Sequence, residues 1–150
     1  MRILAAFAAL FLAGCGSASA GGCPPLPADR AAAPSGCLRY SITPDARTYP
    51  VDAAGISFEV TATNVSTQPC AGPSILLCGG PGLSVFAADG KQVWARTPPI
   101  VACPMLIRLL QPGESMSAQV AWTAPRLAVG AYSVVGGAGP DLGRSYFLVC

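Results

Sequence analysis

Cysteine is the residue type with the widest chemical potential in this chain. There are seven cysteines and no histidine. The first, Cys15, follows an apolar run, and the other six are spread over the remaining sequence: Cys23, Cys37, Cys70, Cys78, Cys103 and Cys150. Thiols form disulfides, bind zinc or act as nucleophiles, depending on their spacing and on the groups beside them. Their even number and the export signal described below predict that these six form disulfides.

A metal site or a catalytic centre has little support in the sequence. No Cys-x-x-Cys pair occurs, and histidine, the commonest nitrogen ligand of zinc, is missing. The absence of histidine also removes the usual base of serine and cysteine nucleophiles. The single lysine, Lys91, lies in a predicted hairpin turn, where exposure to solvent makes it a poor base for a serine nucleophile. We therefore expect no metal, no cofactor and no enzymatic activity.

Acidic residues offer the remaining route to catalysis, because two carboxylates can act as acid and base without histidine. The candidates lie in predicted turns and on the outer faces of predicted strands: Asp45, Asp52, Glu59, Glu114 and Asp141. We interpret them as surface groups. A hydrolase that uses carboxylates alone therefore ranks below the other functions considered.

The N-terminus has the pattern of an export signal. Arg2 precedes an apolar run over residues 3–13, which is too short to span a bilayer as a helix. The run ends in Leu12-Ala13-Gly14-Cys15, which resembles the bacterial lipobox. This resemblance implies a signal peptide over residues 1–14 and a Cys15 that carries diacylglycerol and a palmitate-type acyl chain at the membrane, outside the cytoplasm. The alternative is an ordinary leader cut near residues 17–20, which would discard Cys15.

Charge argues against several classes of partner. Charged residues make up 11% of the chain and the formal net charge is +2. A protein that binds nucleic acid through the phosphate backbone needs a concentrated positive surface, which this composition does not supply. We predict no nucleic-acid partner and a monomeric protein.

Residues 15–37 are rich in Gly, Ala, Pro and Ser and have almost no large apolar side chain. Such a segment cannot bury enough surface to offset the entropy lost on ordering. We expect a flexible tether in which Cys23 pairs locally with Cys37. The other four cysteines are then expected to pair among themselves at one end of the folded domain, in any of three ways.

Residues 38–150 have the alternation of short strands. Met116, Ala118, Val120 and Trp122 fall on one side of the segment 115–122, while its other side is mostly polar. The segment 56–62 alternates in the same way. An Asp-Gly pair at residues 89–90 lies between two apolar runs and predicts a hairpin. Further strands are expected at 38–43, 48–51, 83–87, 92–95, 105–110, 144–149 and after Gly130. The pattern predicts an all-β, antiparallel β-sandwich of seven to nine strands, stabilised by disulfides.

Several short motifs occur in an order that resembles the BsuPI family, named for a Bacillus intracellular proteinase inhibitor. They cover residues 56–135: Phe58-x-Val60-x-Ala62-x-Asn64-x-Ser66, then Val85-Phe86-x-x-Asp89-Gly90-x-x-Val93-Trp94, then Leu110-x-Pro112-Gly113-Glu114-Ser115, then Trp122, then Gly130-x-Tyr132-x-Val134. The resemblance implies that the sandwich predicted over residues 38–150 is immunoglobulin-like. It also implies inhibition of a proteinase. Tyr132 separately resembles the corner tyrosine of immunoglobulin-like folds.

Two groups of apolar residues are candidates for binding. Trp94, Trp122 and Tyr132 would suit a carbohydrate platform, but their spacing favours the core. The connection Thr97, Pro98, Pro99, Ile100 and Val101 is a candidate partner-contact loop, and the alternative is a loop held down by Cys103. We expect a lipid-anchored, extracytoplasmic binding or structural domain that recognises a protein or an envelope component. The alternative is a proteinase inhibitor of the BsuPI type.

Overall fold

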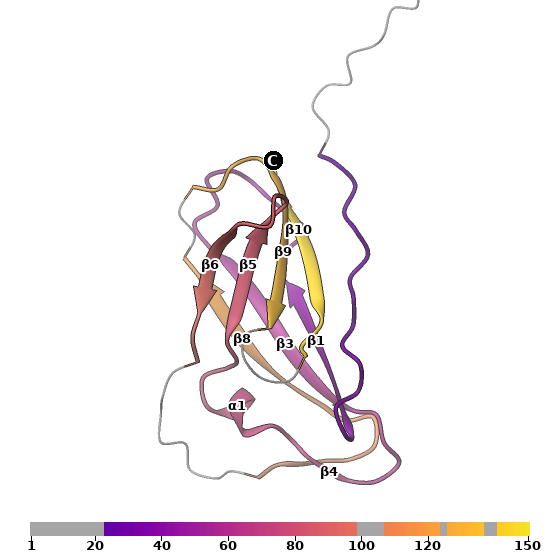
Figure 1. Cartoon of the computed structure of the whole chain (residues 1–150). Coiled ribbons are helices and arrows are strands. Elements are labelled where there is room, and N and C mark those ends of the chain that lie inside the picture. Colours follow the sequence, from indigo (N-terminus) through magenta and orange to yellow (C-terminus); the bar gives the residue numbers. More distant parts are fainter. Residues whose placement is uncertain (1–22, 99–106, 124–125, 137–140) are drawn as a thin grey trace, which may run out of the picture.

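Two facing β-sheets build the protein (Figure 1). The computed structural model describes residues 23–98, 107–123, 126–136 and 141–150. One sheet has three antiparallel strands in the order β1-β3-β8: β1 (Leu38–Pro44), β3 (Ile56–Asn64) and β8 (Ser115–Trp122). The other has the order β2-β10-β9-β5-β6: β2 (Thr48–Tyr49), β10 (Arg144–Val149), β9 (Gly130–Gly136), β5 (Leu83–Ala87) and β6 (Gln92–Arg96).

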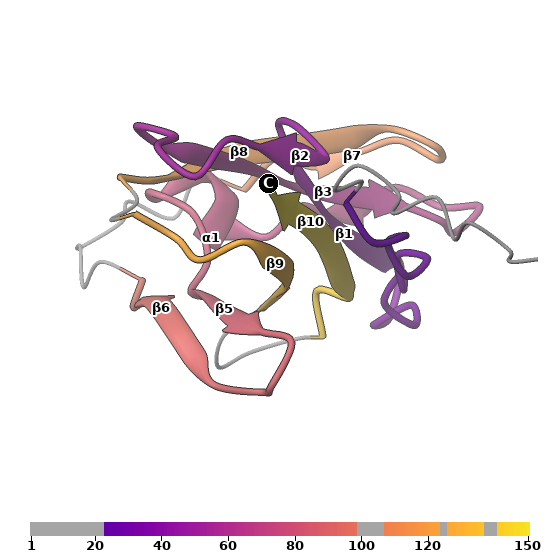
Figure 2. The same cartoon turned by 90° about the horizontal axis from the view of Figure 1, so that it is seen from above.

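The remaining described elements are short and lie at one end of the sandwich (Figure 1). They are a two-stranded ladder and a single helical turn: β4 (Cys70–Ala71), β7 (Leu109–Leu110) and α1 (Ser74–Leu77). Figure 2 looks along the sandwich and separates the layer of β3 and β8 from the layer of β10, β9, β5 and β6. Of the described strands, seven have five residues or more, which confirms the predicted all-β, immunoglobulin-like sandwich.

Alternating side chains build the core between the layers. In β3 the buried positions recur at every second residue, as predicted, and β8 follows the same period with Ala118 half-buried. Val60 lies opposite Ala118 in the ladder. Aromatic rings fill the centre, where Phe58 lies near both Phe147 and Trp94. Trp94 also stacks on Trp122 at a centroid distance of 5.2 Å. These contacts confirm the core interpretation of the tryptophans.

Tyr132 closes a corner of the fold. It is buried in β9, stacks on Phe147 at 5.4 Å, and its hydroxyl donates a hydrogen bond of 2.8 Å to the carbonyl oxygen of Ala128. A tyrosine that bonds to backbone a few residues upstream at this strand is the corner tyrosine of immunoglobulin-like domains. The role expected of Tyr132 is therefore confirmed.

The chain changes sheets at Pro44. β1 pairs with β3, whereas β2 pairs in parallel with β10 of the opposite sheet. Proline has no N–H to donate to a ladder, so a strand that reaches it tends to end or bend there. The predicted hairpin is also present, with Gly90 at φ +82 between β5 and β6 and the Asp89 carboxylate accepting a hydrogen bond from the Lys91 N–H.

The predicted disulfide pairing was wrong in both parts: Cys23 does not pair with Cys37, and the other four cysteines do not pair only among themselves. Cys23 is bonded to Cys150 and Cys37 to Cys70, with a Cα–Cα distance of 6.2 Å in both pairs. Cys37 directly precedes Leu38, which lies opposite Asn64, the last residue of β3. The β1–β3 ladder therefore places Cys37 close to the chain that follows β3 and leads to Cys70 at the start of β4. Cys78 is disulfide-bonded as well, and Cys103 lies outside the described residues.

Residues 23–37 do not form the free tether that we predicted. This segment, indigo in Figure 1, runs beside β10. Arg30 exchanges two backbone hydrogen bonds of 2.8 Å with Arg144, and Ala32 is buried in the core. The edge of β10 offers unpaired backbone groups, and satisfying them compensates for the ordering of a segment with few apolar side chains. Residues 15–22 of the predicted tether lie outside the described residues.

A candidate ligand groove on the sheet face

An open pocket of about 500 Å³ lies on the outer face of the five-stranded sheet. We call it the sheet-face groove and define it by Pro27, Phe86, Ala131, Ser133, Arg144 and Tyr146. Strand alternation explains its position. Val85, Val134 and Phe147 point into the core, so their neighbours in sequence, Phe86, Ser133 and Tyr146, face outward.

Strand register places large side chains on both sides of small ones. Phe86 of β5 lies opposite Ser133 of β9, which in turn lies opposite Tyr146 of β10. Ala131 continues the small-residue row along β9. The two strands that carry the rings are two strand spacings apart, about 9.5 Å. The result is a groove with a small floor and an aromatic residue on either side.

The floor has no free backbone groups to offer a ligand. β9 is the middle strand and pairs with β10 on one side and with β5 on the other. Its N–H and C=O groups are therefore engaged in the two ladders. The side chains of the groove offer two aromatic rings, the hydroxyl groups of Ser133 and Tyr146, and the guanidinium of Arg144.

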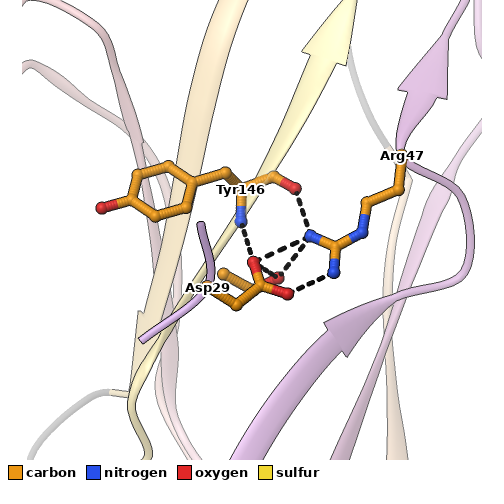
Figure 3. A network of polar contacts seen from close by, with 4 residues as sticks. Asp29, Arg47 and Tyr146 are labelled. Atoms are coloured by element: carbon orange, nitrogen blue, oxygen red, sulfur yellow. Dashed lines mark hydrogen bonds and ion pairs between the residues drawn. The ribbon is translucent and has the colours of Figure 1, made fainter. Parts of the chain in front are cut away.

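Pro27 forms one wall of the groove. Two residues further along the chain, Asp29 belongs to a polar network that holds this segment against β10 (Figure 3). Asp29 Oδ1 accepts hydrogen bonds from Arg47 Nη1 at 2.8 Å, Ser145 Oγ at 2.9 Å and the Tyr146 N–H at 3.2 Å. Its Oδ2 accepts a bond from Arg47 Nη2, and Arg47 Nη1 also donates to the Tyr146 carbonyl at 3.0 Å. This ion pair thus satisfies both backbone groups of Tyr146 at the edge of β10. The hydrogen bond from Arg47 is the main reason that the pKa of Asp29 lies below its ordinary value.

Two arginines lie side by side at one end of the groove. Arg30 and Arg144 are directly opposite each other in an antiparallel bridge, an arrangement that places Cα atoms about 5.5 Å apart and both side chains on one face. Both residues are exposed. In the described part of the chain, the ion pairs are Arg47 with Asp29 and Arg108 with Glu114, so neither member of the arginine pair has a carboxylate partner there.

The predicted contact loop falls largely outside the described residues. Thr97 is exposed and Pro98 is half-buried just after β6, whereas Pro99, Ile100 and Val101 are not described. Cys15 is not described either. The contact loop and the lipidation site therefore stay predictions.

The five candidate carboxylates lie on different elements. Asp45, after β1, accepts bonds from the Tyr49 hydroxyl and the Ser57 N–H. Glu114 accepts from Arg108 and from the Gln111 N–H, and Asp141 accepts from the Gly143 N–H. Asp52 and Glu59 are exposed. Across the described ranges, no group of three or more His, Cys, Asp or Glu side chains is placed to hold a metal ion.

The sheet-face groove was missed at the level of sequence. In the last strand, Arg144 and Tyr146 alternate with Ser145 and Phe147. This alternation could have placed Arg144 and Tyr146 on the outer face of the sheet. Pro27 and Arg30 carried no such signal, because their position depends on pairing with β10. By its composition, the segment that contains Pro27 and Arg30 was predicted to be a flexible tether.

No protein-family model and no curated protein matches this chain. Among solved structures, it is similar to a β-glucosidase from Erythrobacter marinus, with 13% identity, a TM-score of 0.41, and coverage of 75% of this chain and 15% of that chain. It is also similar to an alkylpurine DNA glycosylase from Pseudomonas fluorescens (11% identity, TM-score 0.42, coverage 74% and 30%) and to the CARDB domain of a Pyrococcus furiosus protein (14% identity, TM-score 0.37, coverage 75% and 84%).

This chain therefore spans less than a third of the two enzymes. Likenesses with identities and TM-scores this low carry no argument about activity. The BsuPI resemblance stays a prediction. Within the described residues, no helix has the length and apolar character needed to cross a bilayer.

Proposed function

We propose that this protein is an exported, lipid-anchored binding domain that recognises an envelope component or a protein outside the cytoplasm through the sheet-face groove. The observation that carries the proposal is the groove itself. Phe86 and Tyr146 flank a floor of small residues on a solvent-facing sheet surface, and the positively charged Arg144 lies at the end of the groove. Half-open pockets with aromatic walls and a few polar groups are the usual form of ligand sites.

The anchor is supported by the leader and by Cys15 in its lipobox-like context. Eight peptide units separate Cys15 from Cys23, and a chain of that length reaches at most about 30 Å. Cys23 is bonded to Cys150, which directly follows β10, the strand that carries Tyr146. A lipidated Cys15 would thus hold the groove within a short distance of the membrane.

The test is retention of the detergent-solubilised, full-length protein on detergent-washed envelope material, measured by co-sedimentation. Ser133→Trp fills the groove, and we expect it to reduce the retained fraction at least tenfold. Ser117→Trp is the matched control, because Ser117 is exposed on the outer face of β8 in the other sheet. Equal retention of wild type and Ser133→Trp would contradict the proposal. Thermal unfolding of both variants verifies that they fold.

A further inference from the structure

We infer that the sheet-face groove binds an anionic saccharide, with a sugar ring between Phe86 and Tyr146 and its acidic group at Arg30 and Arg144. This inference rests on the proposed function, since it names the ligand class of the same groove. It is carried by the arginine pair, by the aromatic walls and by the engaged backbone of the floor.

The arginine pair calls for an anion. Like charges directly opposite each other on neighbouring strands repel and destabilise the pairing. Arg30 and Arg144 nevertheless face each other through two backbone hydrogen bonds of 2.8 Å, and no acidic residue lines the described groove. Two guanidinium groups offer planar, multiple donors, which suit the paired oxygens of a carboxylate or a phosphate. An anion bound there would remove the repulsion.

The aromatic walls fit a ring-shaped ligand with polar edges. The faces of Phe86 and Tyr146 offer apolar surface, and the two strands that carry them are far enough apart to admit one ring. The hydroxyl groups of Tyr146 and Ser133 can donate and accept hydrogen bonds beside these surfaces. A sugar has the complementary chemistry, because its C–H faces are apolar and its rim carries hydroxyl groups.

The backbone argues against an extended peptide. Peptides that join a sheet use unpaired N–H and C=O groups at an edge. The groove floor, β9, is paired on both sides, and the edge of β10 is engaged by Arg30, Asp29, Arg47 and Tyr49. A peptide in this groove would gain no ladder hydrogen bonds from the sheet. A saccharide does not depend on such a ladder, because side chains can bond its hydroxyl groups.

The test compares matched probes on the detergent-solubilised, disulfide-bonded, full-length protein by calorimetry. Tetragalacturonate is compared with its methyl ester, which keeps the rings and removes the charge, and phosphorylated maltotetraose with maltotetraose. Tetraglutamate supplies carboxylates without sugar rings. We expect one acidic sugar to bind at least tenfold more tightly than its neutral partner and than tetraglutamate.

Variants then assign the contacts. Arg30→Ser and Arg144→Ser keep the backbone bridge, and each should weaken the acidic sugar at least tenfold while leaving the neutral sugar unchanged. Phe86→Ala should weaken both. Arg39→Ser is the control, because Arg39 is exposed on β1 in the other sheet. Unfolding midpoints verify the fold.

Binding of the neutral sugars as tightly as the acidic ones, or an unchanged affinity in the arginine variants, would overturn the inference. Equal or tighter binding of tetraglutamate would overturn it in favour of an acidic peptide. If Ser133→Trp abolishes envelope retention and no saccharide binds, the ligand class is wrong and the proposed function stands. If retention is unaffected by Ser133→Trp, the proposed function fails by its own test.

Discussion

At the scale of single residues, Asn64 shows how a strand end becomes a junction. Its amide nitrogen donates to the carbonyl oxygens of Gln68 at 2.8 Å and Leu110 at 2.9 Å, and its amide oxygen accepts from the N–H and hydroxyl of Ser66. The side chain is 1% exposed. Every hydrogen-bonding position of the amide is thus used to join β3, the turn that follows it and β7.

Asn64→Ala should lower the free energy of unfolding by about 2 kcal/mol, because it leaves buried backbone groups without partners. Urea denaturation with the disulfides intact measures the change. Thr63→Ala is the control: the Thr63 hydroxyl bonds to Ser115 in an exposed position, so its loss should cost less than about 1 kcal/mol. Equal losses in the two variants would contradict this account.

Asp29 should make stability depend on pH. Its pKa is lowered in the folded protein, mainly by the hydrogen bond from Arg47, so its contribution is present above the ordinary aspartate pKa of about 4 and is lost as pH falls through the lowered value. Asp29→Asn should therefore lower the unfolding midpoint at pH 7, and the difference from wild type should shrink toward pH 2. Asp52→Asn, in an exposed turn, is the control. A difference that is constant from pH 7 to pH 2 would refute the assignment.

At the scale of elements, the edge of β10 is completed by two segments of the chain, residues 29–30 and residues 47–49. Arg30 pairs with Arg144, the side chains of Asp29 and Arg47 cover the backbone of Tyr146, and β2 pairs with the end of the strand. Side chains here take the place of strand residues. The same arrangement brings Pro27 to the groove, so edge protection and the candidate site share one segment.

The Cys37–Cys70 disulfide ties the start of β1 to the chain that follows β3. Its sequence separation of 33 predicts a contribution of about 3 to 4 kcal/mol through restriction of the unfolded chain. The double variant Cys37→Ser, Cys70→Ser should lose that amount in urea denaturation. Its far-ultraviolet dichroism should remain that of a β-protein, because the β1–β3 ladder does not depend on the bond. A loss below about 1 kcal/mol would contradict this contribution.

At the scale of the whole molecule, the Cys23–Cys150 disulfide joins positions 127 apart and closes the chain beside β10. A lipid at Cys15 would hold the whole sandwich near the membrane, because only residues 16–22 separate Cys15 from the disulfide-bonded Cys23. The proposed anchor therefore determines the position of the groove near the membrane as well as the location of the protein.

Lipidation is tested by metabolic labelling with radioactive palmitate in a bacterial host. We expect label in the wild-type protein and none in Cys15→Ser. Cys23→Ser should keep the label, because it lies beyond the lipobox-like motif. A mature N-terminus after residue 15, or an unlabelled wild-type protein, would favour the ordinary leader.

Much of the fold could be predicted because its determinants are local. The two-residue alternation of β3 and β8 is visible in the order of their residues. The Asp89-Gly90 turn needs a positive φ, which glycine adopts readily. The likeness of Tyr132 to the corner tyrosine of immunoglobulin-like folds also predicted its role. The groove could not be predicted in the same way, since it requires knowing which strands are neighbours.

The sequence alone determined the sandwich class, the main strands and the sulfur-rich character of the protein, because these follow from residue types a few positions apart. Only the tertiary structure decided how Cys23 and Cys37 pair, that residues 23–37 line β10, and that Arg30 meets Arg144 beside a groove. These depend on contacts such as that between Asp29 and Ser145, which are 116 positions apart. Such contacts form only when the assembled sheets bring distant parts of the chain together. The local composition of the sequence does not indicate which distant parts will meet.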